Sequence, residues 1–114
     1  MKLHYLEIVT SDVDAACRAY AASLDLEFGP PDPLLGNART GTLPDGGRVG
    51  VRAALSDMET PVVRPYWLVD DIERALAKAV AEGGEVAHPP LEIPGRGTFA
   101  IYILGGVHNG LWAL

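Results

Sequence analysis

Three residues near the end of the chain, His108, Gly110 and Trp112, are spaced two apart, and this spacing puts side chains on one face of a β-strand. An imidazole can transfer a proton or bind a metal, and an indole ring offers a flat apolar surface. The glycine leaves a gap between them. This arrangement predicts a strand with one face built for a small molecule.

Near the start of the chain, Tyr5 and Glu7 have the same spacing on another predicted strand. A carboxylate in a partly apolar cleft can act as a general base, and a phenol or a guanidinium such as that of Arg64 can stabilise the anion that forms. The sequence contains no phosphate-binding loop, dinucleotide fingerprint, paired-cysteine zinc motif or serine-nucleophile elbow.

The composition argues against several classes of partner. The chain has 114 residues, of which 48% are hydrophobic and 21% charged, as in an ordinary globular domain. A net charge of −6 argues against nucleic acid or an anionic membrane surface, and no apolar run is long enough to span a bilayer. The first residues predict a strand rather than a signal peptide, and the single cysteine, Cys17, excludes an intramolecular disulfide. We therefore expect a cytoplasmic protein in which Cys17 is a buried, small apolar residue.

Two stretches of the chain predict a strand followed by an amphipathic helix. They are KLHYLEIVTSDVDAACRAYAASL and PVVRPYWLVDDIERALAKAVAEGG. Each runs from an extended apolar segment through an acidic cap to apolar residues at a period of 3.6. Ser11 with Asp14, and Asp70 with Glu73, have the spacing of helix-capping boxes.

Landmarks in the two halves recur at a nearly constant offset. Asp12 and Asp71 lie 59 residues apart (71 − 12), and Gly50 and Gly110 lie 60 apart (110 − 50). This indicates a duplication with one insertion, in which each half folds as strand, helix, short strand, proline-containing loop and hairpin. The short strands are predicted at 26–28 and 85–88, and the hairpins at 38–43 with 48–54 and at 97–103 with 108–113. The predicted fold class is α+β: one domain over 1–114, with βαβββ modules over 1–57 and 62–114.

The paired βαβββ pattern resembles the vicinal oxygen chelate superfamily, which includes glyoxalase I and the bleomycin-resistance proteins. The resemblance rests on EIVTSDVDAACRAYAASL, VDDIERALAKAVAEGGEV, IPGRGTFAIYI and the terminal GLW, which together cover nearly the whole chain. It implies a curled mixed sheet around a cleft. It also implies a homodimer, with the cleft lying within one chain or between two.

In metal-dependent members of that superfamily, each module supplies one ligand from its first strand and one from its last. The corresponding positions here are occupied by Tyr5, Gly50, Arg64 and Gly110. Glycine has no donor atom and a guanidinium repels a cation, so we expect neither a metal nor another cofactor. The alternative is a divalent metal held by Glu7 and His108. His4, which is expected to face away from the cleft, would join them only if the strand register shifted by one residue.

Extending this face along the strands predicts the lining of the cleft. The predicted ligand-binding residues are Tyr5, Glu7, Arg52, Arg64, Tyr66, His108 and Trp112. Among them, Glu7, Arg64 and Tyr5 are the candidate catalytic residues. The two glycines, Gly50 and Gly110, leave room for a flat ligand between aromatic faces.

A structural role is the alternative for each lining residue. These roles are core or interface packing for Tyr66 and Trp112, an ion pair between Glu7 and Arg64, exposed rim charges for Arg48 and Arg52, and a solvated side chain for His108. His88 is assigned to a loop.

Three functions from different classes fit the sequence. Missing metal ligands, aromatic side chains and the lack of an evident nucleophile favour metal-free binding of a planar or amphipathic small molecule, for sequestration or resistance. The second function is a lyase-like or isomerase-like enzyme with Glu7 as general base. The third is a degenerate module that binds a partner protein.

Overall fold

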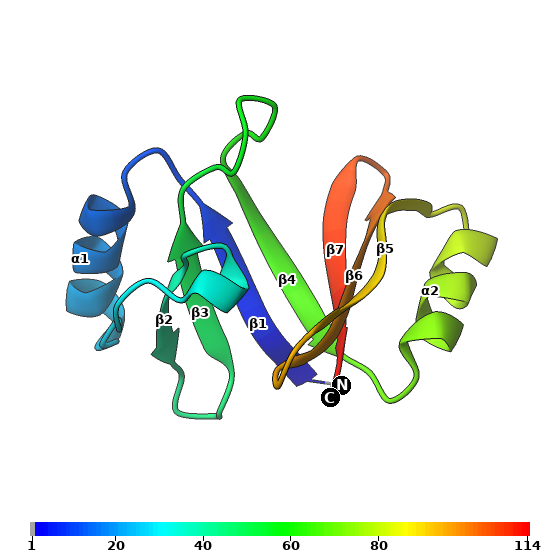
Figure 1. Ribbon diagram of the computed structural model, residues 1–114, viewed down its shortest axis with the longest axis horizontal. Coiled ribbons are helices and arrows are strands. Elements are labelled where there is room, and N and C mark those ends of the chain that lie inside the picture. The colour runs from blue at the N-terminus through cyan, green and yellow to red at the C-terminus, as the bar shows by residue number, and fades with distance from the viewer. Residues whose placement is uncertain (1) are drawn as a thin grey trace. The chain divides into compact units, whose positions relative to one another are not determined.

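The computed structural model describes residues 2–114 and shows an α+β protein (Figure 1). Its elements in chain order are β1 (Lys2–Val9), α1 (Val13–Leu24), the 3-10 helix η1 (Pro33–Leu35), β2 (Arg39–Thr42), β3 (Arg48–Arg52), β4 (Val62–Leu68), α2 (Ile72–Ala81), β5 (Glu85–Ile93), β6 (Gly97–Leu104) and β7 (Val107–Ala113). Both predicted hairpins are confirmed, as β2–β3 and β6–β7. None of the helices within residues 2–114 is long and apolar enough to cross a membrane.

The chain divides into two compact units. The first unit comprises Tyr5–Val63, and the second comprises Arg64–Leu114 together with the start of β1 up to His4. Each unit has its own sheet segment, its own helix and its own apolar core.

In the first unit the strand order is β2-β3-β1, with β1 parallel and β2 antiparallel to β3. Helix α1 lies beside these strands (Figure 1) and packs Cys17 against a core that includes Ile8, Leu26 and Val51. Cys17 is only 3% exposed, which confirms its predicted role as a buried, small apolar residue.

In the second unit the strand order is β4-β7-β6-β5, with β4 parallel to β7 and the remaining pairs antiparallel. Helix α2 buries Ile72 and Leu76 against Ala100 of β6 and Leu111 of β7. This unit has the full βαβββ order that the sequence predicts.

The helix caps lie one residue later than predicted. Asp12 caps α1 by accepting a hydrogen bond from the backbone N–H of Ala15, and Asp71 caps α2 in the same way from Arg74. The residues before these caps, Ser11 and Asp70, can also cap a helix, so residue type alone fixes the cap position only to within one residue.

The predicted short strand at 26–28 is absent from the first unit. In this region Gly29 donates its N–H to the Thr40 carbonyl. Pro30 and Pro31 have no N–H to donate, and pairing resumes only as an isolated bridge between Asp32 and Ala38. In the second unit β5 is longer than predicted and includes His88, so the loop assignment of His88 was wrong. This strand accommodates Pro89 and Pro90 in a register irregularity between His88 and Leu91, and a second irregularity lies between Val86 and His88.

Candidate functional site

A buried ion-pair cluster occupies one face of the first unit. Arg52 donates from Nε to Glu7 at 2.9 Å, and its two terminal nitrogens donate to the two carboxylate oxygens of Glu59, each at 2.7 Å. Arg52 is 5% exposed, so the expectation of an exposed rim charge was wrong for this residue. The hydrogen bonds that Arg52 donates to Glu59, and then the one to Glu7, raise the pKa of Arg52, although burial opposes the charge.

Tyr5 lies on the same strand as Glu7 and is also buried. Burial, and secondarily the negative charge of Glu7, raise the pKa of the Tyr5 phenol well above its ordinary value. The phenol therefore stays protonated at any physiological pH, and it can donate a hydrogen bond to an anion.

The Tyr5 side chain also fills the space above Gly50. A Cβ built at position 50 would collide with the Tyr5 ring and hydroxyl. The expected room for a flat ligand beside this glycine is therefore taken up by the protein itself.

In the second unit, Arg64 and His108 form a polar pair on β4 and β7. Nη2 of Arg64 lies 3.2 Å from Nδ1 of His108. A guanidinium only donates, so Nδ1 accepts in this pair and a neutral His108 carries its proton on Nε2. His108 is half-buried, in contrast to the solvated side chain that was one expectation.

The gap at Gly110 is filled by Tyr66. The two residues are direct partners across β4 and β7, and a Cβ at position 110 would collide with the Tyr66 ring. Tyr66 in turn packs edge-on against Trp112, with ring centroids 5.6 Å apart at 82°. The expected open space between His108 and Trp112 is therefore closed by an aromatic ring.

Trp112 belongs to a row of five rings in the second unit. The row consists of His4, Trp112, Tyr66, Phe99 and His88, with neighbouring centroids 4.8 to 6.3 Å apart. Trp112 and Tyr66 are buried, whereas the other three rings are partly exposed. The indole N–H of Trp112 donates to the Arg96 carbonyl at 2.9 Å, so the Trp112 ring is fixed by the protein. His4 packs on Trp112, so the expectation that it faces away was wrong.

Strand pairing shows which side chains differ at equivalent positions of the two duplicated units. Glu7 pairs with Gly50 in the first unit and Tyr66 pairs with Gly110 in the second, at offsets of 59 (66 − 7) and 60 (110 − 50). The residues two positions after the glycines are Arg52 and Trp112. The same scaffold positions thus carry an ion pair in one unit and an aromatic pair in the other.

The residues at the four strand positions that the resemblance implies for metal ligands do not fit a metal ion. Gly50 and Gly110 have no donor atom and are covered by tyrosine rings, Arg64 is cationic, and the Tyr5 phenol keeps its proton. Within residues 2–114, no group of three or more His, Cys, Asp or Glu side chains is placed to hold a metal ion. The alternative ligands Glu7 and His108 each hydrogen-bond a guanidinium, which a metal would have to displace.

Two residues of these clusters, Glu59 and Phe99, were not predicted from the sequence. Glu59 lies in a loop outside any strand period, so nothing marked it as the partner of Arg52. Phe99 had a usable signal, because the predicted 97–103 with 108–113 hairpin placed it close to Trp112, its direct cross-strand partner.

No protein-family model and no curated protein matches this sequence. Solved structures do match over nearly the full length. A hypothetical protein from Bacillus halodurans C-125 matches with a TM-score of 0.78 at 16% identity, covering 99% of this chain and 94% of the other. Methylmalonyl-CoA epimerase from Mycobacterium tuberculosis matches with a TM-score of 0.73 at 16% identity, over 97% of this chain and 86% of the other.

A variant of the Streptomyces coelicolor methylmalonyl-CoA epimerase, in complex with 2-nitronate-propionyl-CoA, matches with a TM-score of 0.66 at 15% identity, over 99% of this chain and 96% of the other. This chain has the vicinal oxygen chelate fold. At this level of identity the match concerns the vicinal oxygen chelate architecture, and chemistry must be argued from the side chains.

Proposed function

We propose that this protein binds a small planar or amphipathic molecule without a metal, on the aromatic face of its second unit. The observation that carries the proposal is the row of five rings, in which Phe99 and His88 stack at 4.8 Å and stay partly exposed above the buried Trp112. Aromatic side chains bury large areas against flat ligands at low entropic cost.

The same face offers a polar anchor. Arg64 and Tyr66 alternate on β4, as His108 and Trp112 do around Gly110 on β7, so the Arg64–His108 pair and the buried rings share one face. A ligand with a flat apolar body and a negatively charged group would fit this combination. We also propose that the ionic face of the first unit, with Tyr5, Glu7 and Arg52, binds polar groups by itself.

We expect Phe99→Ala to weaken binding of the planar anionic probe 8-anilinonaphthalene-1-sulfonate about tenfold, because removing one stacked ring costs about 1 kcal/mol or more. The measurement is a fluorescence titration in a Trp67→Phe background, where Trp112 is the only tryptophan left and energy transfer reports its proximity to the probe.

The matched control is Val86→Ala, which removes an exposed apolar side chain from the neighbouring strand β5 and should leave the probe affinity unchanged. Equal affinities for Phe99→Ala and its parent, with circular dichroism showing both folded, would contradict the proposed site.

A second candidate function is proton abstraction by Glu7. The charge of Arg52 is already neutralised by the two-point contact with Glu59, so Glu7 can gain a proton without leaving a buried guanidinium uncompensated. The protonated Tyr5 phenol could then donate to the resulting anion. The matching epimerases favour this candidate, since epimerisation at carbon can proceed by removal and return of a proton.

If Glu7 is a base, the protein should exchange deuterium from heavy water into methylmalonyl-CoA, the compound for which those epimerases are named. Glu7→Gln should slow this exchange by about a hundredfold or more, whereas exposed Glu92→Gln should not change it. Mass spectrometry of the thioester measures the exchange, and an equal rate in Glu7→Gln would remove Glu7 from this role.

The resemblance also leads us to propose a homodimer as the working form. The lone, buried Cys17 is compatible with a reducing compartment, and we propose the cytoplasm.

A further inference from the structure

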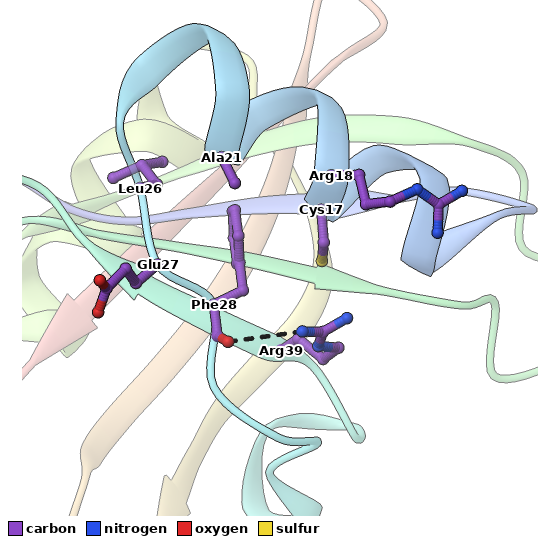
Figure 2. A pocket seen from close by; sticks show the side chains of 7 residues that line it. All are labelled: Cys17, Arg18, Ala21, Leu26, Glu27, Phe28 and Arg39. Carbon is purple, nitrogen blue, oxygen red and sulfur yellow. Dashed lines mark hydrogen bonds between the residues drawn. The ribbon is translucent and has the colours of Figure 1, made fainter.

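A pocket lies in the first unit, lined by residues other than those of the ion-pair cluster. It has a volume of about 440 Å³, in the range of small-molecule sites, and lies between helix α1 and the chain segment that follows it (Figure 2). Its apolar lining comes from Cys17, Ala21, Leu26 and Phe28.

The pocket exists because the first unit is packed less fully than the second at this point. Counted from the capping aspartates, Cys17 and Ala21 correspond to Leu76 and Val80 of α2, which are larger. The missing strand at 26–28 adds to this difference, because the corresponding part of the second unit is paired along β5. The smaller helix residues and the unpaired segment therefore leave a hollow in the first unit.

Two arginines give one end of the pocket a positive charge. Figure 2 shows Arg18 and Arg39 on either side of Cys17, with Glu27 at the other end. Within residues 2–114 no ion pair involves Arg18. Arg39 pairs with Asp14 at 3.1 Å, but the Asp14 side chain is 75% exposed, so solvent screens this contact.

The positions of both arginines carry alanine in the second unit. Arg18 corresponds to Ala77 on the helix. Arg39 pairs with Val51 as Ala100 pairs with Leu111, so Arg39 corresponds to Ala100. In a chain of net charge −6, two guanidiniums beside an apolar hollow are a local exception.

We propose that this pocket binds a small organic anion with an apolar body, such as a medium-chain carboxylate. The apolar body lies against Leu26, Phe28 and Ala21, and the carboxylate lies between Arg18 and Arg39. Arg39 donates from Nε to the Gly29 carbonyl at 2.9 Å, from Nη2 to the Phe28 carbonyl at 3.5 Å and from Nη1 to Asp14 at 3.1 Å. These bonds fix the guanidinium, and each terminal nitrogen keeps a second N–H for the anion.

Cys17 provides a reporter inside the pocket, because it is the only cysteine of the chain. Burial raises the pKa of its thiol, so Cys17 is mainly a neutral thiol that offers an apolar surface and reacts slowly. A ligand in the pocket should slow the reaction of this thiol with 5,5′-dithiobis(2-nitrobenzoate).

The experiment compares octanoate with 1-octanol, which has a similar chain and no charge. We expect octanoate to raise the melting temperature and to slow Cys17 modification with the same concentration dependence, and 1-octanol to do neither at equal concentration. Equal effects of the two compounds, or none from octanoate at 10 mM, would overturn the proposal.

Variants locate the effect. Arg18→Gln should weaken octanoate binding about fivefold, as expected for one partly screened ion contact, and Ala21→Leu should abolish it by filling the hollow. The exposed Arg74→Gln on α2 is the matched control and should bind normally. Unchanged octanoate affinity in Arg18→Gln and Ala21→Leu would place the anion elsewhere. Phe99→Ala should leave octanoate binding intact, so this pocket and the aromatic face are tested separately.

Discussion

Replacing Arg52 by methionine is expected to destabilise the protein by about 3–5 kcal/mol at pH 7, because it leaves Glu7 and Glu59 without their shared cation in a buried setting. The loss exceeds the value of a surface salt bridge, since Arg52 is 5% exposed and makes contacts with three oxygens of the two carboxylates. Urea unfolding followed by circular dichroism measures it.

Two comparisons separate charge from packing in this prediction. The combined variant Glu7→Gln/Arg52→Met/Glu59→Gln should recover part of the lost stability, because it also removes the two carboxylates that Arg52→Met alone leaves without a cation. Arg74→Met, at an exposed position of α2, should change stability by less than about 0.5 kcal/mol. A loss below about 1 kcal/mol in Arg52→Met would show that the cluster is not held by charge.

The architecture could be predicted from the sequence because it is encoded in periodic patterns of apolar residues and glycines. Helical apolar stripes, alternating strands and glycine-marked hairpins are local signals, and the 59-to-60 offset linked them into two equivalent halves. The offset made Gly50 and Gly110 equivalent, and the structure places them on equivalent parallel strand pairs, β1–β3 and β4–β7.

The side-chain contacts on each strand face were harder to predict from the sequence, because they join residues that are far apart along the chain. Glu7 was placed on one strand face with Tyr5, but its hydrogen bond from Arg52 joins residues 45 positions apart in the sequence. A glycine in the sequence signals a missing side chain without showing which neighbour occupies the space. Here two tyrosines occupy it, so a position that looked open for a ligand is part of the core.

The two covered glycines have opposite surroundings, and this has a consequence for ligand binding. Tyr5 covers Gly50 within electrostatic reach of Glu7, Arg48 and Arg52, whereas Tyr66 covers Gly110 among aromatic rings. The first face therefore suits polar or charged groups and the second suits flat apolar ones. One duplicated scaffold supplies both.

Gly110→Ala is expected to destabilise the protein by about 3 kcal/mol, at the upper end of typical overpacking costs. A Cβ at this position would lie 2.6 Å from Cε2 of Tyr66, far inside the 3.5–4.0 Å at which carbon atoms attract. Tyr66 cannot move aside easily, because its ring is 4% exposed and is packed against Trp112 and Phe99. Thermal and urea unfolding measure the loss.

The coupling between the two residues tests the cause. Tyr66→Ala alone should cost about 3–5 kcal/mol through the cavity that it leaves, yet in that background Gly110→Ala should cost less than about 1 kcal/mol because the collision is gone. Gly29→Ala is the matched control, since its Cβ would meet only the Thr40 carbonyl oxygen, at 3.9 Å. Additive losses in the double variant would mean that Tyr66 does not fill the space above Gly110, and the gap between His108 and Trp112 would again be open to a ligand.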